Sequence, residues 1–141
     1  MTENQMNLTF LAISENQSFA RVTAAAFASQ LDPTVAEINE IKTAVSEAVT
    51  NAMIHGYEGV ETDCFVTMRC HLTTNREIYI EVEDFGRGIP NIEQALEPLY
   101  TSKPDEERSG MGFTVMSEFM DDLQVQSSPS GTIVKMHKKM V

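Results

Sequence analysis

Two consecutive runs of alternating apolar and polar residues limit the possible folds more than any other feature of this sequence. In the first run the apolar positions are Cys64, Val66, Met68, Cys70 and Leu72, and in the second they are Ile78, Ile80 and Val82. A repeat of two residues is typical of β-strands with one buried face. The polar segment 73–77 between the runs predicts a β-hairpin, whose apolar face needs a second layer of structure to cover it.

Two amphipathic helices can supply that layer. Each begins with a capping-box signature, in which a hydroxyl residue precedes a glutamate or glutamine by three positions: Ser14 with Gln17, and Thr34 with Glu37. The signatures predict helices over residues 15–30 and 34–55, separated by Asp32-Pro33. Gly56 supplies the stop signal of the second helix.

The remaining segments complete one α+β domain. They predict a first strand over residues 7–13, a short helix over 112–120, and two last strands over 123–127 and 132–138 with a turn at 129–131. This order of elements predicts a two-layer sandwich, in which one mainly antiparallel sheet is covered on one face by helices. A length of 141 residues with 42% hydrophobic content fits a single domain that spans residues 1–141.

The charge of the chain narrows its possible partners. Ten Lys and Arg residues stand against 21 Asp and Glu residues, so the formal net charge is -11. Such a charge opposes a phosphate backbone and an anionic membrane, and it argues against direct binding to nucleic acid. No apolar run reaches the roughly 20 residues that span a bilayer. We therefore expect a cytoplasmic protein whose partners are other proteins.

The second predicted helix carries a polar stripe. Glu47, Asn51 and His55 follow one another at intervals of four residues, and this spacing places them on one side of a helix. The opposite side is apolar. The stripe is a candidate site, but a polar helix face that simply contacts water would have the same spacing.

An acidic residue and two glycines follow the second strand of the hairpin. In the segment Asp84-Phe85-Gly86-Arg87-Gly88, the glycines would let the backbone approach a planar ligand, and the carboxylate could accept a hydrogen bond from an exocyclic amine. An ordinary glycine-rich turn with a solvated aspartate remains the alternative.

A third candidate lies at the start of the predicted helix 112–120. Ser109-Gly110-Met111-Gly112 leads directly into it, and backbone amides at such a helix start can bind phosphate groups. Lys103 and Arg108 precede the segment as cations in an otherwise acidic chain. A plain helix start and two solvated cations would look the same.

The three candidates occur in an order that resembles the GHKL superfamily of ATPases and kinases. Residues 47–52, 84–88 and 110–113 resemble its N, G1 and G2 boxes, and Gly131-Thr132 resembles its last, shorter box. Within this superfamily the segments 14–22, 31–33 and 103–113 are most similar to the sporulation anti-sigma-factor serine kinases. The resemblance covers nearly the whole chain and implies the Bergerat-type ATP-binding fold.

The resemblance also implies roles for particular residues. Asn51 would ligate the Mg²⁺ that bridges the phosphates of ATP, and Glu47 would act as the base toward the hydroxyl group of a protein substrate. Asp84 would bind the adenine amino group, with Gly86, Gly88 and Thr132 beside it. The remaining nucleotide contacts would come from the loop over about residues 90–109, which acts as the ATP lid, and from the helix start after it: Lys103, Arg108, Ser109, Gly110, Met111, Gly112 and Phe113.

Two protein partners follow from the same resemblance. A homodimer would hold a sporulation sigma factor and would phosphorylate an anti-sigma-factor antagonist on serine. Arg21 matches the arginine with which the family contacts its partners. Two alternatives stay open: a binding module that nucleotide controls without useful catalysis, and an anti-sigma kinase of the general-stress group.

Overall fold

The structure is a computed structural model that describes residues 2–56, 64–86, 96 and 112–141. Its strands are β1 (Asn4–Leu11), β2 (Phe65–Leu72), β3 (Glu77–Asp84), β4 (Asp122–Ser128) and β5 (Gly131–Lys139). Its helices are α1 (Glu15–Ala28), the 3-10 turn η1 (Ser29–Leu31), α2 (Val35–Asn51), the π-helical turn η2 (Ala52–Gly56) and α4 (Gly112–Phe119). No helix within these ranges is long and apolar enough to cross a membrane.

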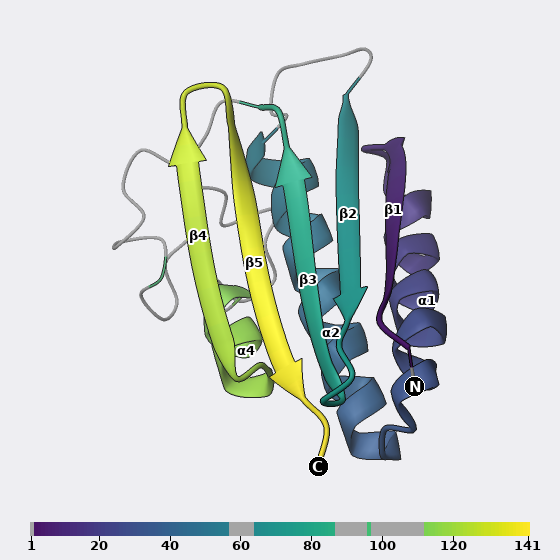
Figure 1. Cartoon of the computed structure of the whole chain (residues 1–141). Coiled ribbons are helices and arrows are strands. Elements are labelled where there is room, and N and C mark those ends of the chain that lie inside the picture. Colours follow the sequence, from purple (N-terminus) through teal and green to yellow (C-terminus); the bar gives the residue numbers. More distant parts are fainter. Residues whose placement is uncertain (1, 57–63, 87–95, 97–111) are drawn as a thin grey trace.

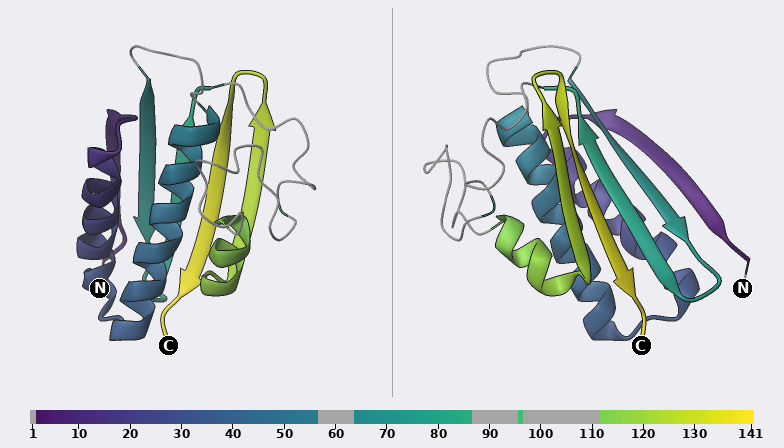
Figure 2. Two further views of the ribbon diagram at one scale, coloured as in Figure 1. Left: turned by 180° about the vertical axis from the view of Figure 1, so that it is seen from behind. Right: turned by 60° about the vertical axis from the view of Figure 1, so that its left-hand side comes forward.

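The five strands form one sheet in the order β1-β2-β3-β5-β4, and every neighbouring pair is antiparallel. Figure 1 shows the open face of this sheet toward the viewer with α1, α2 and α4 behind it. Figure 2 shows the same two layers from behind and from the side. The predicted α+β two-layer sandwich and the predicted hairpin of β2 and β3 are therefore confirmed.

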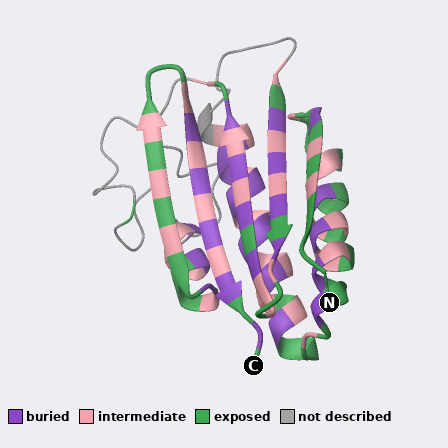
Figure 3. Ribbon diagram, in the orientation of Figure 1, coloured by how far each residue is buried: buried purple, intermediate pink, exposed green. Residues whose placement is uncertain are grey.

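The core lies between the sheet and the helices. Along β3 every second side chain is buried, which gives Figure 3 its banded strands. From the helix layer, Ile41, Val45 and Val49 of α2 are fully buried against this face. Burying each such side chain contributes about 1.5–3 kcal/mol to stability. This burial fixes α2 against the middle of the sheet.

The start of α2 confirms one of the two predicted capping boxes. The Thr34 hydroxyl accepts the backbone N–H of Glu37 at 3.1 Å, and the Glu37 carboxylate accepts the backbone N–H of Thr34 at 2.8 Å. The second oxygen of the Glu37 carboxylate accepts the backbone N–H of Val141 at 2.8 Å. One buried side chain thus caps the helix and holds the C-terminal residue.

The capping box predicted at Ser14 is wrong. Ser14 has a helical backbone conformation and makes no side-chain cap, because its hydroxyl donates to the Glu15 carboxylate instead. The Asn16 amide binds the Leu11 carbonyl at 2.9 Å and fixes the turn between β1 and α1. β1 also starts earlier than predicted, at Asn4, because it pairs with the full length of β2.

Candidate active site

Helices α2 and α4 meet where two of the predicted site residues lie. A Cβ atom placed on Gly112 would lie 3.1 Å from Asn51 Nδ2 and 3.2 Å from Glu47 Oε2. Asn51 is only 8% exposed. Glu47 and Asn51 of the polar stripe therefore do not simply face water: they lie against the first residue of α4, where a Cβ atom would press on both side chains and shift them by a few tenths of an ångström.

The other end of α4 is held by a buried cation. Lys138 of β5 is 8% exposed, and its ammonium group donates to the carbonyl oxygen of Phe119 at 2.7 Å. The same group lies 3.6 Å from the carboxylate of Glu40 on α2. A cation at a helix C-terminus also interacts favourably with the helix dipole. Lys138 thus ties α4 to both α2 and the sheet.

A buried carboxylate lies at the end of β3. Asp84 is 5% exposed, and its Oδ1 accepts the backbone N–H of Gly86 at 3.0 Å. Burial raises the pKa of this carboxyl group above its usual value, although hydrogen bonds from the backbone of Gly86 and Thr132 oppose the rise. A buried acceptor of this kind gains from any further donor that a ligand brings.

Gly131 brings β5 close to this carboxylate. A Cβ atom on Gly131 would lie 2.3 Å from the backbone oxygen of Asp84, and the φ of Gly131 is +149°. Both observations exclude any residue with a side chain at this position without a shift of the backbone. The next residue, Thr132, is 5% exposed and pairs with Asp84 across the two strands.

Asp84 and Thr132 belong to a polar row that crosses three strands. In register with Thr132 on the far side lies Ser127 of β4, and their hydroxyl oxygens are 2.8 Å apart. The next row on the same face of the sheet, two positions along these strands, is wholly apolar: Val82, Val134 and Val125. The apolar floor of the sandwich therefore ends in a row of acceptors and hydroxyls. Sequence analysis missed Ser127, although the alternation of β4 and the two-residue turn after Ser128 would have placed it opposite Thr132.

The polar residues of α2 and the polar row of the sheet lie toward the same end of the molecule. In Figure 1 the end of β3, the turn between β4 and β5, and the end of α2 all point upward. The chain continues from Asn51 directly into η2, which contacts both β3 and β5. The structure thus brings the predicted N-box and G1-box segments to one end of the sandwich.

Only some of the predicted site residues can be placed. Gly86 is half-buried beside Asp84, and Phe113 is half-buried and packs against the hydrophobic core. The other predicted nucleotide contacts lie outside the described residues, as does almost all of the predicted lid 90–109: Gly88, Lys103, Arg108, Ser109, Gly110 and Met111.

Arg21 lies on α1, the helix that packs against α2. Its Nη2 donates to the Ser18 hydroxyl at 3.0 Å, while its Nε is buried and has no hydrogen-bond partner in the part of the chain that the structure describes. Phe19 and Val22 beside it are exposed. One turn earlier, Gln17 donates to the Thr50 hydroxyl, the neighbour of Asn51.

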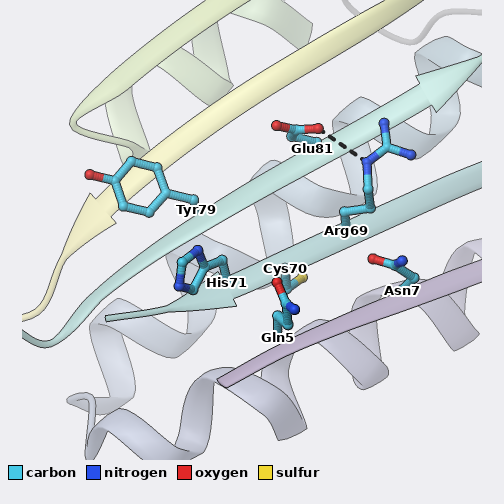
Figure 4. A pocket seen from close by; sticks show the side chains of 7 residues that line it. All are labelled: Gln5, Asn7, Arg69, Cys70, His71, Tyr79 and Glu81. Atoms are coloured by element: carbon cyan, nitrogen blue, oxygen red, sulfur yellow. Dashed lines mark hydrogen bonds and ion pairs between the residues drawn. The ribbon is translucent and has the colours of Figure 1, made fainter. Parts of the chain in front are cut away.

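The open face of the sheet carries a separate hollow of about 410 Å³ between β1, β2 and β3. Figure 4 shows Arg69 at one side of it, paired with Glu81 at 3.1 Å. None of the predicted site residues lines this hollow. The candidate site therefore belongs to the helix-covered face.

The residues at this end of the sandwich fit an adenine nucleotide. The Asp84 carboxylate offers a buried acceptor to an amine, and the Asn51 amide and the Glu47 carboxylate offer the oxygen ligands and the base that phosphate chemistry with Mg²⁺ uses. Gly112 opens an eight-residue helix, and the backbone amides at such a start can donate to an anionic group.

Comparisons with known proteins show the family of the chain. The sequence profile of the histidine kinase-like ATPase domain matches residues 12–138. An anti-sigma F factor of Clostridium acetobutylicum is 62% identical over 143 residues, which cover 99% of this chain and 96% of that protein. An anti-sigma F factor of Bacillus licheniformis is 53% identical, over 98% of this chain and 94% of that protein.

Solved structures show the same fold. A Mycobacterium tuberculosis chain with RsbU and RsbW domains superposes with a TM-score of 0.69 at 17% identity, covering 97% of this chain and 32% of that chain. A blue-light activated histidine kinase of Erythrobacter litoralis superposes with a TM-score of 0.58 at 26% identity, covering 77% of this chain and 32% of that chain.

The fold and the matching sequence profile together define a histidine kinase-like ATPase domain. The chain belongs to the histidine kinase-like ATPase family and, within it, to the anti-sigma F factors.

Proposed function

We propose that this chain is an anti-sigma factor that binds and inhibits a sporulation sigma factor. As an ATP-dependent serine kinase, it also phosphorylates an anti-sigma-factor antagonist and thereby inactivates it. The observation that carries this proposal is the meeting of Glu47 and Asn51 with Gly112, at the same end of the sandwich as the buried carboxylate of Asp84. The relatives named anti-sigma F factors, at 62% and 53% identity, support the assignment of the partners.

The end of β3 binds the adenine base in this proposal. Asp84 accepts a hydrogen bond from the exocyclic amine, and its burial makes this bond stronger than it would be in water. Gly86 and Gly88 let the backbone approach the ring, and Thr132 lies beside the carboxylate. The apolar row of buried Val82 and Val134 and partly buried Val125 lies next to this polar row on the same face of the sheet.

The phosphates lie between α2 and the start of α4. The amide oxygen of Asn51 holds Mg²⁺, which neutralises phosphate charge and orients the γ-phosphoryl group when bound. The backbone amides of Gly110 and Gly112 donate to phosphate oxygens, and Met111 between them and Phe113 after them belong to the same contact segment. Residues 90–109 form the lid of the single domain 1–141, and Lys103, Arg108 and Ser109 contribute the donors that neutralise the remaining charge.

Glu47 is the base of the transfer. The serine hydroxyl oxygen of the substrate forms a bond to the γ-phosphorus while the bond from that phosphorus to the β,γ-bridging oxygen breaks. ADP leaves with the electron pair of that bond, and the serine proton goes to the Glu47 carboxylate. In a loose transition state this base mainly orients the hydroxyl, so its position beside Asn51 and Gly112 matters more than an altered pKa.

The partners bind through α1 in this proposal. Arg21 contacts both the sigma factor and the antagonist in the cytoplasm, and the chain acts as a homodimer. The exposed Phe19 and Val22 give this helix an apolar surface next to the guanidinium group, a combination that is enriched in protein interfaces. Arg21→Ala should weaken both complexes, and full affinity for both partners would remove Arg21 from the interface.

The test incubates the purified chain with labelled ATP, Mg²⁺ and the antagonist, and it identifies the labelled residue by mass spectrometry. The proposal expects label on serine of the antagonist and competition between antagonist and sporulation sigma factor for the chain. ATP binding without transfer would favour the nucleotide-controlled binding module. Preference for a general-stress sigma factor would move the chain to the other group of anti-sigma kinases.

A further inference from the structure

The polar row at the end of the sandwich contains one residue to which the proposed function gives no role. Ser127 of β4 lies in register with Thr132, and the two hydroxyl oxygens are 2.8 Å apart. Thr132 lies in turn in register with Asp84 and is 5% exposed. Ser127 therefore bonds to the side chain of Thr132, and the backbone of Thr132 donates in turn to the proposed adenine-binding carboxylate of Asp84.

The direction of the hydroxyl pair decides what Thr132 can offer to a ligand. A hydroxyl group has one hydrogen and two acceptor lone pairs. If Ser127 donates to Thr132, the hydrogen of Thr132 stays available for a ligand. If Thr132 donates to Ser127, Thr132 can only accept. The direction of the bond between Ser127 and Thr132 thus decides whether a donor or an acceptor stands beside the Asp84 carboxylate.

We propose that Ser127 is a positioning residue for base recognition, which donates to the Thr132 hydroxyl and thereby presents Thr132 as a donor to a ring nitrogen of adenine. This inference rests on the proposed function, because it assumes that Asp84 binds the adenine amine. In adenine the ring position next to that amine is an acceptor. A carboxylate acceptor beside a hydroxyl donor matches this edge.

The same arrangement disfavours guanine. Guanine has a carbonyl oxygen where adenine has the amine, and a ring N–H where adenine has the acceptor nitrogen. The carbonyl oxygen of guanine would face the Asp84 carboxylate, so two acceptors would meet. The ring N–H would face the hydrogen of the Thr132 hydroxyl, so two donors would meet. Leaving buried polar groups mispaired is the most effective way for a site to reject a ligand. Ser127 would therefore contribute to the choice of ATP over GTP.

The structure offers closely matched variants for a test. Ser127→Ala removes the hydroxyl, and Ser127→Thr keeps it. Ser128→Ala removes the neighbouring hydroxyl, which is exposed and binds only Ser130 within the described ranges. The dissociation constants of ATP, GTP and an ATP analogue with C–H in place of the ring nitrogen beside the amine are measured for each variant by calorimetry, with the urea midpoint as a readout of stability.

The inference expects Ser127→Ala to weaken ATP binding about threefold to tenfold, the worth of one hydrogen bond. Ser127→Ala should change the dissociation constant of the analogue by less than about twofold. Added to Thr132→Val, it should likewise change the dissociation constant of ATP by less than about twofold. Ser127→Ala should also narrow the preference for ATP over GTP, while Ser127→Thr and Ser128→Ala keep wild-type affinity.

Equal weakening of ATP and of the analogue, or an effect that persists in the Thr132→Val background, would show that Ser127 acts only through the structure of the hairpin and would overturn the inference. Unchanged ATP affinity in Ser127→Ala would overturn it as well. A wild-type chain that binds no ATP would refute the proposed function together with the inference.

Discussion

Replacing Asp84 by asparagine should move nucleotide affinity and folding stability in opposite directions. The variant keeps the size of the side chain but loses the charge. A hydrogen bond to a charged group contributes about 1.5–3 kcal/mol, and each 1.4 kcal/mol is a factor of ten. The dissociation constant of ATP should therefore rise about tenfold to a hundredfold.

The stability of the nucleotide-free protein should not fall. Burial raises the folded-state pKa of Asp84 above the ordinary value of 3.8, so the ionised carboxylate costs stability at every pH above the folded-state pKa. This cost disappears as the pH falls through that pKa, because the folded protein then takes up the proton. Asp84→Asn removes the cost at neutral pH and keeps one acceptor oxygen for the backbone of Gly86 and Thr132.

The assay combines calorimetry with urea unfolding of the nucleotide-free protein. At neutral pH the variant should have an equal or higher urea midpoint than the wild type, and any advantage should shrink in acid. Asp121→Asn controls for the loss of one negative charge, because Asp121 is exposed, lies just before β4 at the opposite end of the sheet, and as asparagine keeps an acceptor for the backbone N–H of Lys139. Unchanged ATP affinity, or a urea midpoint that falls along with the affinity, would refute the role given to Asp84.

Three further substitutions test other parts of the site and fold. Gly112→Ala should leave stability within about 1 kcal/mol but slow transfer at least tenfold, since its Cβ would lie 3.1 Å from Asn51 Nδ2 and 3.2 Å from Glu47 Oε2; an unchanged transfer rate would contradict the close approach. Gly131→Ala should lower the free energy of unfolding by more than about 1 kcal/mol in urea titrations, because its Cβ would lie 2.3 Å from the Asp84 backbone oxygen. Glu37→Gln should cost about 1–3 kcal/mol at neutral pH. Burial opposes the charge of Glu37, but hydrogen bonds from Thr34 and Val141 lower its pKa below 4.5, so the wild-type advantage should be present above that value and disappear in acid; an advantage that persists in acid would contradict the assignment.

Local signals in the sequence predicted the helices and strands well, and competing local contacts explain why the capping box predicted at Ser14 does not form. Thr34 and Glu37 form the predicted capping box because both partners lie within one helical turn. Ser14 has the same signature, but its neighbour Glu15 takes the hydroxyl hydrogen and Asn16 binds the carbonyl of Leu11. A capping signature shows which hydrogen bonds are possible, but it does not predict which of several possible partners forms them.

The surroundings of the site residues could not be predicted, because they depend on contacts between distant segments. Spacing on α2 placed Glu47 and Asn51 on one face but left open whether that face contacts water. The answer comes from α4, which starts some 60 positions later and covers them. The insertion of β5 between β3 and β4 likewise brings Thr132 beside Asp84 and Ser127 beside Thr132. A sheet order of this kind is set by packing over the whole domain.

The most direct test of the proposed kinase is to measure ATP binding and phosphoryl transfer in the same preparation of the Glu47→Ala variant. The transfer rate to the antagonist should fall at least a hundredfold, the usual contribution of a positioned base, while ATP affinity changes by about twofold at most. Glu118→Ala, an exposed glutamate on α4, should match the wild type in both. Transfer by Glu47→Ala at close to the wild-type rate would contradict the account, because no step of the mechanism would then depend on the side chain that meets Asn51 and Gly112.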